Sequence, residues 1–209
     1  MVQFWKISLS LSVVCVYRKM SILKLHKLLI SVMVATIMSL VACSTPKNQY
    51  ITVEDETLGT FVQVKCNTTH STEDVREHIK QIDTDMKASM SIFDPASLLS
   101  QINANTCDTL DEHLIYNITL AEKFYTLSDG AYDITVKPLT DAWGFGRNSA
   151  TTTPNVDSLI EFVGYDRIAI DDNRLVKGDS RTQIHLNSIA KGYTVDLVAR
   201  ELEAMGVVD

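Results

Sequence analysis

Small polar residues and a lysine open a predicted helix near the C-terminal end of the chain. The segment NSIAKGYTVD (187–196) follows an apolar run that ends at Leu186. Such a junction aims free backbone N–H groups at an anion, and Lys191 adds a positive charge one turn into the helix. Carbonyl groups of the opening turn could also face a metal ion. A phosphate or pyrophosphate would fit, although taken alone the segment is explained more simply by a plain turn with a solvated lysine.

A second segment, SDGAYDITVKPLTDAWGFG (128–146), combines glycines with aromatic residues. The glycines allow close backbone approach, and Tyr132 and Trp143 offer flat surfaces to a ring system. Asp133 could accept a hydrogen bond from a ring N–H or a ribose hydroxyl. Alone, this segment reads as a core loop with packed aromatics. The segments TLGTFVQV (57–64) and MSIFDPASLLSQIN (90–103) each read alone as a turn beside core residues.

The elements that must position these segments follow from periodicity, capping residues and turn residues. Ser71 with Asp74 forms an N-terminal capping pattern for one helix, and Asp83 and Asp85 are expected on its solvated face. We expect helices over 71–90, 98–103, 114–125, 155–164 and 188–205. We expect strands over 50–67, divided at Gly59, and over 168–170, 175–177 and 183–186.

This order of strands and helices predicts a mixed α+β domain. The last predicted helix turns one face to the core, and Gly206 ends it; the residues of that face are Ile189, Tyr193, Leu197 and Met205. An amphipathic helix needs a sheet to cover, so we expect a further strand beyond it and a domain whose second half is missing from this sequence.

Composition and charge exclude several classes of protein. The chain has 209 residues, of which 45% are hydrophobic and 22% charged, which excludes collagen-like, low-complexity and wholly disordered chains. The net charge of -7, with no basic patch outside the N-terminus, argues against nucleic-acid binding. The four cysteines are too few for a disulfide scaffold and lack metal-type spacing; Cys66 and Cys107 could pair in an oxidising compartment, but cysteines on separate elements are more often free.

The N-terminal residues 1–43 carry basic side chains and no acidic ones. A basic stretch around Lys24 and Lys27 precedes an uncharged apolar run over 28–42, as in a secretory signal peptide. The run ends in Leu40-Val41-Ala42-Cys43, which resembles the lipobox of bacterial lipoproteins, so Cys43 is the expected site of lipidation. The alternative is an uncleaved transmembrane helix, because the uncharged stretch approaches the length of a span.

The sequence thus predicts a lipoprotein signal peptide over 1–43, with translation starting most simply at Met20, a polar tether over 44–49 and a domain over 50–209. A palmitate-type anchor would hold the protein at the bacterial cell envelope, on the periplasmic side of the inner membrane.

In this order and spacing, the four segments resemble the ApbE family of flavin transferases, which use FAD as the donor of an FMN group. The resemblance runs from about Leu58 to Gly206 and rests chiefly on SDGAYDITV-x-PL-x-x-x-WGFG and SIAKGY-x-VD. It implies an ApbE-like mixed sheet with packed helices. The lipobox agrees with it, since many members are exported lipoproteins.

The resemblance implies FAD contacts at the residues that match the family's binding motifs. These residues are Leu58, Phe93, Ala131, Tyr132, Asp133, His185 and Lys191. It also implies that Ser188 is a ligand of Mg²⁺ through its backbone carbonyl. The remaining metal ligands and the histidine thought to assist catalysis belong to the family's C-terminal half, and nothing in 1–209 replaces them, so the sequence predicts no catalytic residue.

Two residues depart from the family pattern. His185 stands where the family usually has a carboxylate. A group that accepts hydrogen bonds is thereby replaced by an imidazole that can either donate or accept them. Lys137 stands where glycine is more common and could contact a phosphate or point outward.

The reaction implied is transfer of FMN from FAD to a Thr or Ser hydroxyl of an acceptor protein, an exported redox flavoprotein subunit, with release of AMP. An acidic protein can bind the pyrophosphate only if Mg²⁺, Lys191 and helix N–H groups reverse the local field. Two alternatives stay open. One is an FAD pyrophosphatase that yields FMN and AMP, and the other is a flavin-binding fragment without activity.

Overall fold

The computed structural model describes residues 24, 26–27, 29–33, 47–146, 152–207 and 209. The chain divides into two units, residues 1–47 and 48–209. In the first unit, residues 24, 26–27 and 29–33 are helical. The predicted lipobox with Cys43 lies outside the described residues. None of the helices within the described ranges has both the length and the apolar character that a membrane span requires.

The second unit begins with a β-hairpin. Strands β1 (Gln49–Thr57) and β2 (Thr60–Thr68) pair antiparallel. Leu58 and Gly59 connect them with φ angles of 51° and 67°, as a two-residue hairpin turn with the twist of the strands requires. The predicted division at Gly59 is therefore confirmed.

The predicted helices of the first half are confirmed. In α2 (Thr72–Met90), Ser71 Oγ accepts from the N–H of Asp74 at 3.1 Å, and the Asp74 carboxylate accepts from the N–H of Ser71 at 3.0 Å. This capping box satisfies two backbone donors that a helix start leaves free. Ser97 caps α3 (Leu98–Asn103) and Asp111 caps α4 (Glu112–Leu127) through their side-chain oxygens as well.

The second half contains one helix that the sequence did not predict. This helix, α5 (Lys137–Ala142), accommodates a proline in its first turn, where no backbone N–H is needed. The remaining elements were expected, apart from the short 3₁₀ turn η1; they are α6 (Val156–Ile160), η1 (Tyr165–Arg167), β3 (Ile168–Asp171), β4 (Arg174–Lys177) and α7 (Asn187–Ala204).

The strand predicted over 183–186 is wrong. Gln183 makes one isolated parallel bridge with Val136, and the N–H of His185 donates to the carbonyl of Ile134 at 3.0 Å. The amide side chain of Asn103 donates to the carbonyl of Ile184 at 2.8 Å and accepts from its N–H at 2.9 Å. The side chain of Asn103 and a short backbone contact with 134–136 thus take the place of neighbouring strands.

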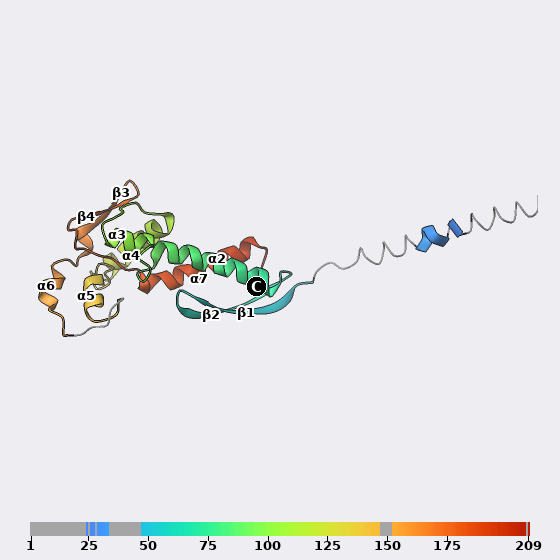
Figure 1. Ribbon diagram of the computed structural model, residues 1–209, viewed down its shortest axis with the longest axis horizontal. Coiled ribbons are helices and arrows are strands. Elements are labelled where there is room, and N and C mark those ends of the chain that lie inside the picture. Colours follow the sequence, from blue (N-terminus) through green and yellow to red (C-terminus); the bar gives the residue numbers. More distant parts are fainter. Residues whose placement is uncertain (1–23, 25, 28, 34–46, 147–151, 208) are drawn as a thin grey trace, which may run out of the picture. The chain divides into compact units, whose positions relative to one another are not determined.

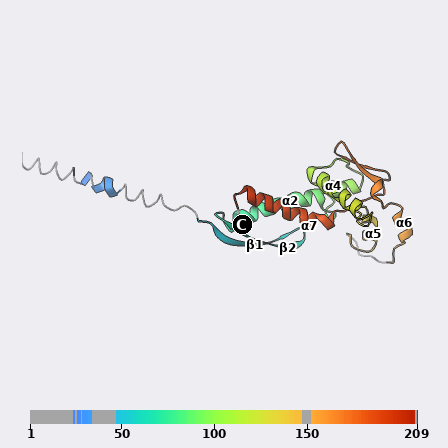
Figure 2. The same cartoon turned by 180° about the vertical axis from the view of Figure 1, so that it is seen from behind.

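Helices α2 and α7 lie side by side along the hairpin, and α3 to α6 with β3 and β4 gather at the other end of the unit (Figures 1 and 2). The fold is the mixed α+β class expected. One apolar cluster joins the hairpin to α2 and α7; its buried members are Ile51, Val53, Cys66, Val75, Ile79, Val198, Leu202 and Val207. Cys66 and Cys107 are both free.

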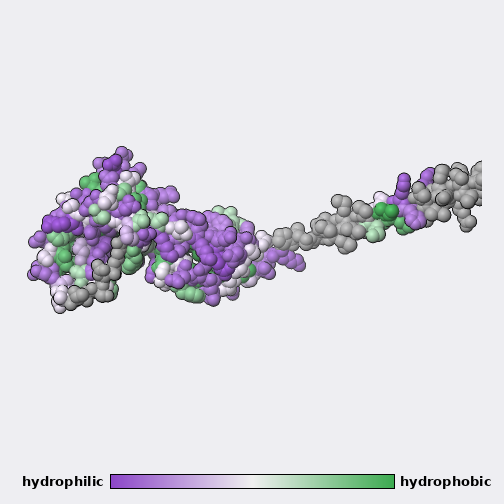
Figure 3. All heavy atoms as spheres, in the orientation of Figure 1, coloured by the Kyte–Doolittle hydropathy of each residue, from purple (hydrophilic) through white to green (hydrophobic). Residues whose placement is uncertain are grey.

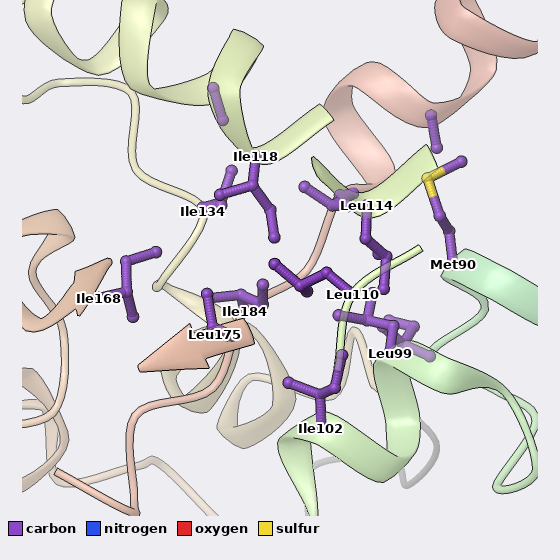
Figure 4. Packing of buried hydrophobic residues seen from close by; sticks show 14 of the residues in the cluster. Met90, Leu99, Ile102, Leu110, Leu114, Ile118, Ile134, Ile168, Leu175 and Ile184 are labelled. Carbon is purple, nitrogen blue, oxygen red and sulfur yellow. The ribbon is translucent and has the colours of Figure 1, made fainter. Parts of the chain in front are cut away.

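A second, larger cluster fills the end of the unit that carries α3 and α4. Figure 4 shows Leu99, Ile102 and Leu114 beside Leu175 and Ile184, so that side chains from helices, β4 and the 183–186 segment meet. On the face seen in Figure 3, the described surface is mainly hydrophilic with scattered hydrophobic side chains. This core fixes the segments that surround the candidate site.

The predicted inner face of α7 is only partly right. Tyr193 is buried, but the other buried residues are Ala190, Thr194, Val198 and Leu202, whereas Ile189, Leu197 and Met205 are partly buried. The hydroxyl of Thr194 donates to the carbonyl of Ala190 at 2.8 Å, so a polar residue can lie in the buried stripe. Gly206, with a φ of 84°, follows the helix as predicted.

Candidate functional site

A cavity of about 690 Å³ brings together three of the four segments singled out in the sequence. Leu58 and Gly59 of the hairpin turn form one part of its wall, Phe93 of the loop after α2 another, and Lys191 of α7 a third. Cavities of this size commonly bind small molecules. Of the residues expected to contact FAD, the fold therefore places Leu58, Phe93 and Lys191 around one space.

The hairpin turn is held in place by α2. The N–H of Leu58 donates to Asp83 Oδ1 at 2.8 Å, and Lys87 Nζ donates to Asp83 Oδ2 at 2.6 Å. The Asp83 side chain is only 13% exposed, so the expectation that it lies on a solvated face is wrong. The sequence analysis did not identify Asp83 as a positioning residue. The one signal in the sequence is Lys87, which lies one helical turn later and can pair with Asp83.

Phe93 presents an aromatic ring to the cavity and is 59% exposed. The N–H groups of Phe93 and Asp94 both donate to Ser91 Oγ at 3.1 Å, and Ser100 Oγ donates to the carbonyl of Ser91 at 2.9 Å. These bonds fix the loop that carries the ring. An exposed aromatic ring on a fixed loop can stack against a planar ligand.

The start of α7 gives the cavity its positive end. No side chain caps this helix, and its first turn has no acidic residue, so the first N–H groups and the helix dipole favour an anion. Lys191 is exposed and forms no ion pair with the residues that the structure describes, whereas Lys87 is paired with Asp83. Lys191 is therefore the cation of the wall that is available to a ligand.

One hydrogen bond joins the segment 128–146 to the start of α7. The hydroxyl of Tyr132 lies 2.8 Å from Oγ of Ser188, and its ring meets Phe124 edge-on at 5.9 Å between centroids. Asp133 Oδ1 accepts from the N–H and the hydroxyl of Thr135 at 2.7 and 2.6 Å. Ala131, Tyr132 and Asp133 do not line the 690 Å³ cavity, and their predicted contacts with FAD stay predictions.

A second cavity of about 270 Å³ has Lys137, Asp141 and Gln183 in its wall, and the charges of Lys137 and Asp141 also act on His185. Nδ1 of His185 is buried and has no hydrogen-bond partner among the residues that the structure describes. Burial lowers the pKa of His185 below its usual value of 6.5, and the ammonium of Lys137 adds to this effect. Ile92 belongs to the walls of both cavities, so the two spaces adjoin.

The described residues do not fit Mg²⁺ by themselves. Among them, no three side chains of His, Cys, Asp or Glu gather closely enough to hold a metal ion, whereas Mg²⁺ prefers several oxygen ligands in octahedral geometry. The side chain of Ser188 is engaged with Tyr132. The role predicted for Ser188 uses its backbone carbonyl and does not involve this side chain, and it stays a prediction.

Comparison with known proteins gives a consistent result. A family model described as the ApbE family matches residues 58–209. A protein of Haemophilus influenzae named FAD:protein FMN transferase is 34% identical over 188 residues, which cover 82% of this chain and 54% of that protein. A protein of Vibrio cholerae with the same name is 27% identical over 186 residues, which cover 84% of this chain and 55% of that protein.

Solved structures agree. The flavin transferase ApbE of Vibrio cholerae superposes with a TM-score of 0.72 at 25% identity, over 77% of this chain and 55% of that one. The apo form of the Pseudomonas stutzeri flavinyl transferase ApbE gives a TM-score of 0.72 at 26% identity, over 77% of this chain and 54% of that one. The chain thus spans about half the length of the relatives it matches.

Proposed function

Because the chain belongs to the ApbE family, we propose that it serves the transfer of FMN from FAD to a hydroxyl group of an acceptor protein. The observation that carries the proposal is the convergence of Leu58, Phe93 and Lys191 on one cavity of about 690 Å³. The names of the relatives, FAD:protein FMN transferase, support the same reaction. Since the chain spans about half of their length, the activity of the whole protein is part of the proposal.

In the proposed reaction, the oxygen of a Thr or Ser hydroxyl on the acceptor attacks the phosphorus of the FMN half of FAD. A new P–O bond forms, the bond between that phosphorus and the bridging oxygen breaks, and AMP leaves with that oxygen. The hydroxyl proton passes to solvent. Such chemistry depends on placement and on neutralisation of charge more than on covalent help from the protein.

The residues of the cavity supply placement and part of the charge. Lys191 and the first N–H groups of α7 attract the pyrophosphate, and Phe93 offers its exposed ring to one of the flat rings of FAD. Asp83, which is paired with Lys87, accepts from the N–H of Leu58 and so holds the hairpin turn in place. We keep Mg²⁺ as the metal that the resemblance predicts, and chelation with EDTA followed by addition of Mg²⁺ tests that requirement.

The setting of the reaction is a further part of the proposal. The sequence around Cys43 supports export and lipid anchoring at the cell envelope, which would bring the protein to an exported redox flavoprotein subunit as acceptor. Metabolic labelling with a palmitate analogue tests this point: the Cys43→Ser variant should lose the label that the unchanged chain carries.

Incubation of the full chain with FAD, Mg²⁺ and an acceptor bearing a target Thr tests the proposed transfer. We expect fluorescent flavin on the acceptor in a denaturing gel, and none with the acceptor whose target Thr is replaced by Val. Release of AMP without any acceptor would instead identify an FAD pyrophosphatase. Binding of FAD with neither product would identify a flavin-binding fragment.

A further inference from the structure

We propose that the outer edge of strand β2 binds a further β-strand, which is added antiparallel in the groove between β2 and α7. The partner is an extended segment from the half of the relatives' length that this chain does not span. The inference concerns the assembly of the domain, and it does not depend on the proposed transfer of FMN.

The first observation is a row of backbone groups at the outer edge of β2. Among the described residues, the sheet of β2 has two strands, so β1 covers one edge of β2 only. Because Thr57 and Thr60 close a two-residue turn as a hydrogen-bonded pair, every second residue of β2 turns its N–H and C=O away from β1. These residues are Phe61, Gln63, Lys65 and Asn67. No backbone group elsewhere in the described chain is hydrogen-bonded to the first three.

The second observation fixes the direction of the added strand. The N–H of Asn67 donates to the backbone oxygen of Asp209, which confirms that Asn67 faces the outer edge. Nε2 of His70, just after β2, lies 3.0 Å from the carbonyl oxygen of Met205 at the end of α7. The chain that leaves α7 therefore meets β2 at its C-terminal end. A strand that starts there and follows β2 must run towards Phe61, which is the antiparallel direction.

The third observation is an apolar groove along the same edge. A cavity of about 160 Å³ lies between β2 and α7, and its wall includes Val62, Val64 and Val195. Val62 and Val64 are only partly buried, and Val195 is 60% exposed. Side chains directly opposite each other in an antiparallel pair lie on the same face of the sheet. We therefore expect apolar residues at alternate positions of the added strand, opposite Val62 and Val64.

Strand β2 lacks the features that protect a permanently exposed edge. Natural edge strands are short, or carry proline, bulges or several charged side chains. Strand β2 has nine residues and no proline, and Lys65 is its one charged residue. Its pairing with β1 contains no bulge. Such an edge favours pairing with another strand, and a third strand stabilises a two-stranded hairpin.

A strand added along this edge ends beside the candidate site. From Asn67 to Phe61 it runs over about seven residues, or roughly 23 Å. Leu58 and Lys191 belong to the wall of the groove and also to the wall of the 690 Å³ cavity. The added strand therefore brings the residues that follow it to that cavity.

Binding of a fluorescent synthetic peptide to the full chain, followed by anisotropy, tests the inference. The peptide copies about ten residues of the Haemophilus influenzae relative, those that follow its counterpart of α7. We expect binding, and a loss of about tenfold in Gln63→Pro, because proline removes an N–H of the outer edge. Gln63→Ala keeps that N–H and is the matched control; its affinity should be unchanged.

A second variant tests the groove and serves if Gln63→Pro does not fold. Val195→Glu places a carboxylate where the added strand would cover it, and burial of an unpaired charge is costly. We expect it to weaken binding of the peptide by about tenfold. The control Val176→Glu changes a valine that is 49% exposed on β4 and should leave the affinity unchanged.

Amide hydrogen exchange measured by NMR identifies the edge that the peptide occupies. The peptide should protect the N–H groups of Phe61, Gln63 and Lys65. It should leave those of Val62 and Val64 unchanged, because these already pair with β1.

Three results would overturn the inference: no binding of the peptide, binding without protection of the outward amides, or equal binding to the unchanged chain, Gln63→Pro and Val195→Glu. Protection of the same amides that rose with protein concentration in the absence of the peptide would identify a second copy of the chain as the partner, and would overturn the choice made above. Titration with FAD keeps the two proposals apart. If FAD binds and the peptide does not, the proposed function stands without this inference.

Discussion

The hydroxyl of Tyr132 lies 2.8 Å from Oγ of Ser188, and this one bond joins the aromatic segment 128–146 to the start of α7. The two residues are 56 positions apart in the chain. Either hydroxyl can be the donor. The bond therefore holds the two segments together whichever of the two oxygens carries the shared proton. It places the aromatic segment beside the end of the cavity at which Lys191 lies.

Replacing Tyr132 by Phe should remove this bond and keep the ring against Phe124. Because the pair is exposed, we expect the free energy of unfolding to fall by only about 0.5–1 kcal/mol. Urea denaturation of Tyr132→Phe, Ser188→Ala and the double variant measures the coupling between the two side chains. Strictly additive losses would show that the bond does not form in solution.

Replacing Lys191 by Met should weaken binding of FAD about tenfold, which corresponds to about 1.4 kcal/mol. The reason is that Lys191 is the cation of the cavity wall without an ion pair among the described residues. The matched control is Lys123→Met, which removes the same charge from an exposed position on α4. If both variants bound FAD equally well, Lys191 would not contact the ligand.

Two glycine substitutions should change stability in opposite directions. Gly59 has a φ of +67°, and a Cβ there would meet no atom within 4 Å, so Gly59→Ala should cost about 1–2 kcal/mol through backbone strain alone. Gly192 lies inside α7 with the same open space, so Gly192→Ala should stabilise the chain by about 0.5–1 kcal/mol. Thermal unfolding followed by circular dichroism compares them. A loss of stability in Gly192→Ala would contradict the helix described there.

The folded protein should lose stability as the pH falls from about 7 to about 5, in part through His185. Burial, with the ammonium of Lys137 second, lowers the pKa of this side chain in the folded state, whereas the unfolded chain takes up its proton near pH 6.5. In that window the unfolded state binds more protons, so stability decreases with decreasing pH. In His185→Asn the decrease should be smaller, as measured by urea denaturation at pH 7 and pH 5. Parallel decreases in the two proteins would show that His185 is not held neutral.

Local rules predicted most of the fold because the signals are short-range. The capping pair Ser71 and Asp74 and the turn at Gly59 each act within a few residues of the chain. The segment 183–186 misled the prediction because its burial does alternate as in a strand. Its partners are the side chain of Asn103 and the backbone of Ile134 and Val136, and no pattern within 183–186 indicates such distant contacts.

The site was predicted in part for the same reason. Motif order identified the segments of Leu58, Phe93 and Lys191, and the fold brings these three residues to one cavity. The positioning role of Asp83 depends on how α2 packs against the hairpin turn. The ion pair of Lys137 with Asp141 depends on the presence of α5, in which the two residues lie one helical turn apart. Helix α5 was not predicted because its proline and the surrounding glycines are typical of a loop. Proline is nevertheless compatible with the first turn of a helix.

A crystal structure of the chain grown with FAD tests the central claim most directly. We predict electron density for the pyrophosphate beside Lys191 and the first turn of α7, with one ring of FAD against Phe93. A cavity filled by the protein's own side chains, with FAD absent or bound elsewhere, would contradict the assignment.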